Sequence, residues 1–193
     1  MSNKIVIIGV GQLGSHVLLA ARNWEGTLKV VDFDRVEQKN TQAQFHTKMG
    51  LGRNKTVALQ QAMQGMFGLR LDTAPVRLTD DNTEQVLGGA TLVLDCTDNA
   101  EARRVISRYV RANDIPCLHG ALDANGTFGR IVWDEHFKED EEGAPGQATC
   151  EDGETLPFGM LTAAQMAVTA QRFLSLGEKR SYMVNPTGIL RLA

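Results

Sequence analysis

Short apolar segments alternate with amphipathic segments along the first two-thirds of the chain, and this alternation constrains the fold more than any other feature. Each apolar segment is short enough for a buried strand, and a helical pattern follows it. The predicted strands lie at 4–10, 27–34, 70–78, 91–96 and 115–121, and the predicted helices at 13–22, 54–67, 80–87 and 100–114. Repeated strand–helix units form parallel sheets with helices on both faces. The sequence therefore predicts an α/β, Rossmann-like, doubly wound and mainly parallel sheet.

The last third of the chain departs from this alternation. A further strand is predicted at 129–134, and the acidic, breaker-rich segment at about 134–157 predicts a mobile loop. An amphipathic helix at about 159–176 and a hairpin that turns at Asn185–Gly188 are the predicted C-terminal additions to the sheet. No linker separates independent units, so we expect a single domain over 1–193 with its core at about 4–121.

Composition excludes several classes of function. The 193 residues carry a net charge of −3 and a pI near 5.8, which argues against nucleic acid as the main partner. No apolar run is long enough for a membrane span or a secretory signal, so we expect a cytoplasmic protein. The cysteines, Cys96, Cys117 and Cys150, lie too far apart for a CxxC pair, and we expect no structural zinc.

The stretch GVGQLGS, between the first predicted strand and the first predicted helix, places Gly9, Gly11 and Gly14 in a GxGxxG pattern. Glycines at such a turn let phosphate approach the backbone, and the helix N-terminus favours an anion. Asp32 ends the second predicted strand at a spacing that suits a ribose hydroxyl. The pattern predicts nucleotide binding. The structural alternative is a packing turn beside a charged strand end.

Further acids follow the predicted strands, at the edge where doubly wound sheets bind ligands. Asp34 comes shortly after Asp32, and DCTDN brings Asp95 and Asp98 to the end of another strand. Two hypotheses are open for Asp98. It holds Mg²⁺ on a triphosphate, or it caps the following helix together with Asn99.

Two basic side chains lie at the same predicted edge. Lys55 begins a predicted helix, where it either reaches phosphates as a point charge or is simply solvated. His119 is the candidate acid or base of an NAD-dependent oxidoreductase, a function that GxGxxG and Asp32 would also suit. We interpret His119 instead as a hydrogen-bonded core histidine, and DCTDN argues against the oxidoreductase.

These motifs, in this order, resemble the ThiF/MoeB/HesA family, adenylyltransferases related to ubiquitin-activating enzymes. The family pattern is GxGxxGS, DxDxVxxxNxxRQF, GxxK and DCTDNxxxR, followed by a strand similar to IPLVSGA. The chain has GVGQLGS, DFDRVEQKNTQAQF, GRNK, DCTDNAEAR and IPCLHGA. The resemblance runs from about residue 4 to 121, and it resumes at ATCEDG and at the helix containing AAQMAVTAQRFL.

The resemblance implies transfer of AMP from ATP, with Mg²⁺, onto a carboxylate. The acceptor is usually the C-terminal glycine of a small ubiquitin-like or sulfur-carrier protein or peptide, and the protein is usually a homodimer or works with a partner subunit. Lys55 and Asp98 would act on the reacting phosphates. The residues that the resemblance assigns to the nucleotide are Gly9, Gly11, Gly14, Asp32, Asp34, Asn40, Gln44 and Lys55, with Asp98 as the Mg²⁺ ligand.

Three departures from the family pattern bear on turnover. The arginine of NxxRQ is Ala43 here, the paired CxxC ligands are missing, and we expect no counterpart of the family's N-terminal arginine helix. Lys48, His46 or Arg53 would replace the lost cation, or a partner protein would supply it. If nothing replaces it, the chain is a catalytically degenerate ATP-binding scaffold or partner subunit.

Cys150 matches the position at which some family members form a thiol-linked or persulfide intermediate. Its acidic neighbours would raise the pKa of a thiol and so disfavour the reactive thiolate. A reactive thiol and a bystander both remain open for this residue. Cys96 and Cys117 lie in apolar strands, and we predict that they are packing residues.

Overall fold

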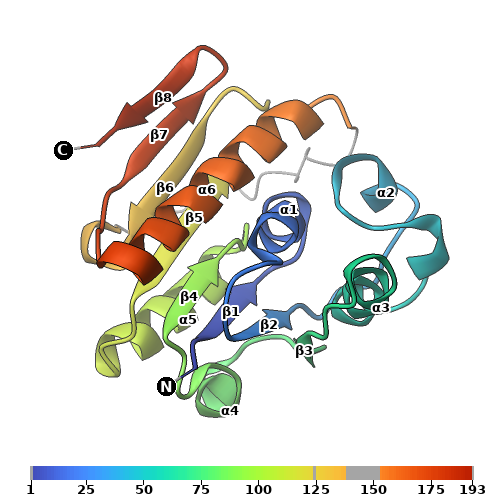
Figure 1. The fold of residues 1–193 in the computed structure, drawn as a ribbon, viewed down its shortest axis with the longest axis horizontal. Helices are drawn as coiled ribbons and strands as arrows, with labels where there is room; N and C mark the ends of the chain where they lie inside the picture. Colours follow the sequence, from blue (N-terminus) through green and yellow to red (C-terminus); the bar gives the residue numbers. More distant parts are fainter. Residues whose placement is uncertain (1, 124, 138–152, 193) are drawn as a thin grey trace.

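The computed structural model describes residues 2–123, 125–137 and 153–192. Within them, one sheet has eight strands in the order β3-β2-β1-β4-β5-β6-β7-β8. β1 to β5 pair in parallel, and β6 to β8 extend the sheet in antiparallel pairing (Figure 1). The strands are β1 Lys4–Ile8, β2 Thr27–Val31, β3 Asp72–Ala74, β4 Leu92–Asp95, β5 Cys117–Leu122, β6 Gly129–Trp133, β7 Tyr182–Asn185 and β8 Gly188–Arg191. The predicted fold class and C-terminal hairpin are confirmed.

Helices cover both faces of this sheet, as predicted. α1, α3 and α6 lie on one face, and α4 and α5 lie on the other (Figure 1). The α-helices are α1 Gln12–Ala21, α2 Asn40–Ala43, α3 Lys55–Phe67, α4 Thr83–Leu87, α5 Ala100–Ala112 and α6 Leu156–Leu176, and the 3₁₀ helices are η1 Lys48–Gly50, η2 Asp80–Asn82 and η3 Asp134–His136.

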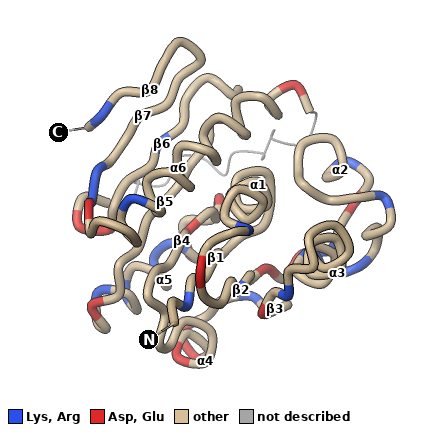
Figure 2. The backbone as a smooth tube through the Cα atoms, viewed as in Figure 1, with Lys and Arg blue, Asp and Glu red and all other residues tan. Residues whose placement is uncertain are grey.

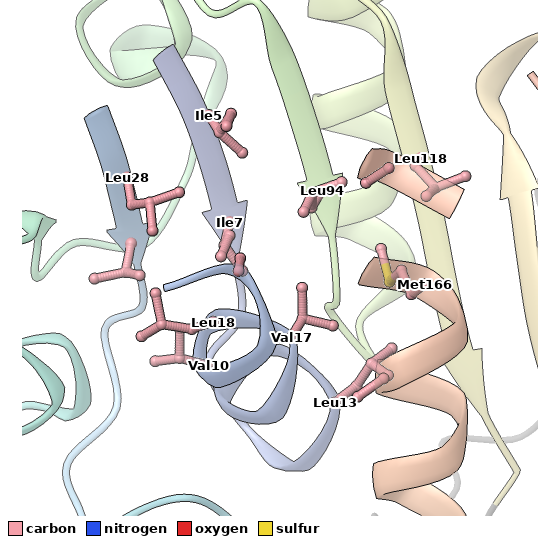
Figure 3. Close-up of a cluster of buried hydrophobic side chains, with 14 of the residues drawn as sticks. Ile5, Ile7, Val10, Leu13, Val17, Leu18, Leu28, Leu94, Leu118 and Met166 are labelled. Carbon is pink, nitrogen blue, oxygen red and sulfur yellow. The ribbon is translucent and has the colours of Figure 1, made fainter. Parts of the chain in front are cut away.

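The alternation of side chains along the central strands builds a core on each face. Ile5 and Ile7 of β1 pack in the cluster under α1, α3 and α6. Val6 and Ile8 pack in the opposite cluster, under α4 and α5. In Figure 3, Ile7 faces α1, and Met166 approaches from α6. A strand buried on both faces must be apolar at its buried positions, which is why IVII, residues 5–8 of β1, is a continuous apolar run.

The predicted loop at 134–157 is wrong at both ends. Its first residues, Asp134–His136, form η3, in which Asp134 is buried against other charged groups. Its last residues begin α6, which starts at Leu156 because Pro157 suits the first turn of a helix. Residues 138–152, and with them Cys150, lie outside the described part of the chain. The short helix α2 was also missed, because its four residues show no apolar periodicity.

Charge and hydropathy in the structure agree with the composition. Figure 2 shows basic and acidic positions interspersed around the described backbone. Among the described helices, none has the length and apolar character that crossing a membrane requires.

Candidate functional site

The candidate site lies at the carboxyl ends of β1, β2 and β4. The chain order reverses at β1, because β2 and β3 lie on one side of it and β4 and β5 on the other. Doubly wound sheets bind ligands beyond the strand ends at such a switch point. The glycine loop after β1, the acids after β2 and the segment 95–98 after β4 meet at this edge.

The glycine loop requires glycine for two separate reasons. Gly9 has a φ of +79°, and a Cβ there would lie 2.9 Å from the carbonyl oxygen of Cys96. A Cβ on Gly14 would lie 1.9 Å from the carbonyl oxygen of Gly9. Around Gly11 the space is open, since the nearest atom to its Cβ position is the Gln44 Nε2, 4.0 Å away. No side chain caps the N-terminus of α1, so its positive end faces this space.

Asp32 holds the glycine loop in place. Its Oδ2 accepts a hydrogen bond from the Val10 amide at 2.8 Å, and its Oδ1 accepts one from the Asp34 amide at 2.9 Å. The carboxylate is buried, and burial raises its pKa although Lys55 and the two amides oppose this. Each oxygen keeps a second lone pair, which leaves an acceptor for a ribose hydroxyl.

Lys55 is a buried cation, so the hypothesis that it is merely solvated is wrong. Its Nζ lies 3.2 Å from the Asp34 Oδ2, and its side chain is 9% exposed against 48% for Asp34. Asn54 caps α3 by accepting from the Thr56 amide, which fixes the backbone from which Lys55 projects. The ion pair thus joins a buried cation to a half-exposed carboxylate.

Asn40 and Gln44 differ in how free they are for a ligand. Asn40 is buried, and its Oδ1 accepts a hydrogen bond from the Glu37 amide at 2.8 Å, so this side chain closes a local turn. Gln44 directs its amide group toward Gly11, and its Oε1 is buried with no hydrogen-bond partner. A buried polar atom without a partner is costly, so Gln44 carries an acceptor that no described residue satisfies.

Asp98 is exposed in the segment that follows β4, and Asn99 caps α5 by accepting from the Ala102 amide at 3.1 Å. The cap therefore does not need the Asp98 carboxylate. Among the described residues, no group of three His, Cys, Asp or Glu side chains could hold a metal ion. Asp98 alone fits Mg²⁺ only if phosphate oxygens and water complete the coordination, which is the usual arrangement for this ion on a nucleotide.

Sequence reasoning missed a buried charged network behind Asp98. The His119 Nδ1 lies 2.8 Å from the Asp95 Oδ2, and its Nε2 lies 3.0 Å from the Asp134 Oδ1. The Arg111 Nε donates to the Asp134 Oδ2 at 2.6 Å. The prediction of a hydrogen-bonded core histidine is confirmed. Its second partner was missed because Asp134 lies where the predicted strand at 129–134 meets the predicted loop at about 134–157.

Both ring nitrogens of His119 face carboxylates, so both must carry protons and the ring is an imidazolium. Burial alone would lower the pKa of His119, but the hydrogen bonds to the Asp134 and Asp95 carboxylates raise it well above its usual range. Burial would raise the pKa of Asp134, but His119 and Arg111 lower it to about 2. The network alternates in charge, and its four groups balance.

The position of the family arginine is closed in this chain. Ala43 is fully buried. Of the predicted substitutes, His46 donates from Nε2 to the Val10 carbonyl at 3.0 Å, and burial lowers its pKa to about 4, so it is neutral near pH 7. Arg53 is exposed and donates to Gln61, and Lys48 is exposed. The structure therefore rules out His46 as the missing cation.

Cys96 and Cys117 are packing residues, as predicted. The Cys96 Sγ lies 3.9 Å from the Met166 Sδ. Burial raises the pKa of both thiols, so neither is a thiolate near pH 7.

Several known proteins with similar sequences are named adenylyltransferases. The adenylyltransferase and sulfurtransferase UBA4 of Meyerozyma guilliermondii is 28% identical over 182 residues, which cover 89% of this chain and 43% of that protein. The sulfur carrier protein adenylyltransferase of Thermus thermophilus is 34% identical over 123 residues, which cover 62% of this chain and 45% of that protein. The chain thus spans less than half the length of these relatives.

Solved structures show the same fold. E. coli MccB with ATP aligns with a TM-score of 0.76 at 15% identity, over 98% of this chain and 62% of that one. PaaA aligns with a TM-score of 0.75 at 16% identity, over 98% of this chain and 62% of that one. Residues 1–185 match the family described as the ThiF family. The chain belongs to the ThiF family.

Proposed function

We propose that this chain binds ATP with Mg²⁺ and transfers AMP to the C-terminal carboxylate of a small ubiquitin-like or sulfur-carrier protein or peptide. The observation that carries the proposal is the convergence of an open glycine loop, a buried Lys55 and an exposed Asp98 at one switch point. Family membership supports the reaction type, since relatives of this chain are named adenylyltransferases.

The site suits ATP in a definite orientation. The triphosphate lies over Gly11 and the N-terminus of α1, where the backbone approaches closely and the helix dipole favours an anion. Lys55 exchanges Asp34 for a phosphate oxygen, and Gln44 turns its amide to the same group. Asp32 accepts from a ribose hydroxyl with its remaining lone pairs.

The chemistry needs little more than position and charge. The acceptor carboxylate attacks the α-phosphorus, a new P–O bond forms to AMP, and pyrophosphate leaves with the electrons of the broken P–O bond. The nucleophile is already ionised at neutral pH, so no protein base is required. Mg²⁺, held by Asp98, would supply charge to the phosphates. Lys55 and the α1 amides stabilise the negative charge that builds on the leaving group.

Ala43 favours a second candidate, an ATP-binding scaffold or partner subunit without turnover. The family pattern has an arginine at this position, whereas Ala43 is fully buried and His46 is neutral. Losing one preorganised stabilising group costs about 10²–10³ in rate. In this candidate nothing replaces the missing cation, and the chain binds ATP without transferring AMP. An arginine supplied by a partner protein would instead restore the first candidate.

ATP–pyrophosphate exchange separates the two candidates. The acceptors are carrier proteins that end in glycine, and the matched control is the same carrier with a C-terminal amide. We expect exchange that needs Mg²⁺ and the free carboxylate and falls roughly 100-fold in Asp98→Ala. ATP binding without exchange would favour the scaffold. Binding of NAD in preference to ATP would contradict both candidates.

A matched pair of variants tests the missing charge. Ala43→Arg adds the family cation, and Ala43→Gln adds a side chain without charge at the same buried position. If charge limits the rate, only Ala43→Arg increases exchange, by about tenfold or more. Equal changes in the two variants would show that the position responds to size alone.

A further inference from the structure

The charged network connects directly to the segment that carries Asp98. The Asp95 Oδ2 accepts from His119, and its Oδ1 accepts from the Thr97 amide at 2.9 Å and from the Thr97 hydroxyl at 2.7 Å. The Thr97 carbonyl in turn accepts from the Arg103 Nε at 3.1 Å and Nη2 at 2.6 Å. Asp98 is the next residue along the chain.

We propose that His119 is a positioning residue for the nucleotide site, which acts through Asp95 and Thr97 to place Asp98 against Mg²⁺ and the triphosphate. This inference rests on the proposed function, because it takes Asp98 as the residue that meets the metal. It adds a role for His119, Asp134 and Arg111 that none of the sequence motifs assigns.

The geometry leaves the His119 ring no freedom to turn. Each ring nitrogen donates to a carboxylate, and the Phe137 ring stacks on the imidazole at 4.0 Å between centroids, with 12° between the planes. Asp95 is fully buried, so water does not compete for its oxygens. One Asp95 oxygen is therefore directed at His119, and the other is directed at Thr97.

The far end of the network supplies the charge balance that makes this arrangement possible. Together, the His119 imidazolium and the two carboxylates have a net charge of −1. Arg111 of α5 neutralises this charge through its ion pair with Asp134. Without the imidazolium, Asp95 would be a buried, unpaired carboxylate, and it would take up a proton or turn toward another donor. Rotation of the carboxyl group removes the acceptor from Thr97, and protonation makes Oδ1 a weaker acceptor, so either change loosens the segment before Asp98.

A positioning role differs from a purely structural one in how it depends on Asp98. The experiment measures ATP dissociation constants by calorimetry, with Mg²⁺ and with EDTA, for the unmutated chain, His119→Gln, Asp98→Ala and the double variant. We expect His119→Gln to weaken Mg²⁺-dependent ATP binding about tenfold and to leave binding in EDTA within about twofold. In the Asp98→Ala background, His119→Gln should have no further effect on the Mg²⁺ dependence.

The control is His136→Gln, which changes an exposed histidine in η3 and should leave the Mg²⁺ dependence unchanged. An equal effect of His119→Gln with and without Asp98, or an equal loss in EDTA, would overturn the inference. If His119→Gln does not fold, Arg111→Gln takes its place in the same set of variants. Arg111 is half exposed, so its replacement should destabilise the fold less. It should weaken Mg²⁺-dependent binding about threefold, and only in the presence of Asp98.

The inference and the proposed function fail in different ways. ATP binding without pyrophosphate exchange would overturn adenylyl transfer, yet the binding cycle would still decide the role of His119. Exchange in the unmutated chain, together with a His119→Gln effect that ignores Asp98, would support the function and overturn the inference. No ATP binding by the unmutated chain would overturn both.

Discussion

Asp32 at the end of β2 and Asp95 at the end of β4 are both buried carboxylates that hold a loop of the site, but they are neutralised differently. Asp32 accepts from two backbone amides, and its burial outweighs them, so its pKa is raised. Burial would raise the pKa of Asp95 too, but the hydrogen bond and charge of His119 lower it. Dipoles therefore fix the glycine loop, whereas full charges fix the segment before Asp98.

Replacing His119 should cause the largest loss of stability among the changes considered for these two carboxylates. His119→Ala leaves Asp95 and Asp134 buried without their shared partner, and losing one member of a buried ion pair costs about 3–5 kcal/mol. The measurement is urea unfolding at pH 7. The double variant His119→Gln with Asp95→Asn removes a directly paired cation and carboxylate, keeps the Arg111–Asp134 pair, and should recover at least about half of that loss. A loss below about 1 kcal/mol for His119→Ala would contradict a charged network.

The contribution of His119 to the free energy of unfolding should depend on pH above neutrality. The pKa of His119 is raised from 6.5 to about 12, so its contribution to stability is fully present below pH 6.5 and is lost as pH rises toward 12. The free energy of unfolding should fall over this range by up to about 1.4 kcal/mol per pH unit. His119→Gln should lack this slope when unfolding is measured at pH 7, 8, 9 and 10.

On the acid side the sign depends on the carboxylate. The pKa of Asp134 is lowered from 3.8 to about 2, so its contribution is present above pH 3.8 and is lost as pH falls toward 2. The raised pKa of Asp32 has the opposite effect, because protonation relieves a buried charge in the folded chain. Asp32→Asn should therefore make the acid-induced loss of stability steeper, and a shallower loss would count against the raised pKa.

The glycine-loop half of the site could be predicted well from sequence because its residues are local. Gly9, Gly11 and Gly14 lie within one turn, and Asp32 follows the next strand, so strand periodicity alone brings them together. The burial of Lys55 was not predictable. It follows from the ion pair with Asp34, which forms only when α3 docks beside β2.

The charged network could not be predicted, because its residues lie far apart in the sequence and one of them borders an acidic segment. Asp134 begins an acidic segment, and composition there favoured a loop. Its partners are Arg111 on α5 and His119 on β5, which only the antiparallel pairing of β5 with β6 brings within reach. The full burial of Ala43 is likewise a property of packing, and a short polar helix gives no periodic signal of it.

A smaller loss of stability is expected at Asp32, whose carboxylate is held by backbone amides. Asp32→Asn keeps one acceptor oxygen but turns an amide donor toward a backbone N–H, either that of Val10 or that of Asp34. An unsatisfied buried donor costs about 1–3 kcal/mol, and we expect the lower end because no full charge is stranded. Urea unfolding at pH 7 measures it. A loss as large as that of His119→Ala would show that the Asp32 charge, and not its hydrogen bonds, holds the glycine loop.

The smallest loss of stability is expected for an arginine–carboxylate pair that is exposed to solvent. Arg108 and Arg111 of α5 each pair with a carboxylate. Arg108 donates to both Asp80 oxygens at 2.7 and 2.8 Å, with side chains 65% and 60% exposed. Solvent and salt screen such a pair, so Arg108→Gln should cost less than about 0.5 kcal/mol and nothing measurable in 0.5 M NaCl. Arg111→Gln removes a donor to a nearly buried carboxylate, and it should cost about 1.5–3 kcal/mol with little change in salt. Equal losses of stability in the two variants, both reduced by salt, would show that Asp134 is as solvated as Asp80. The two ion pairs would then not differ in strength.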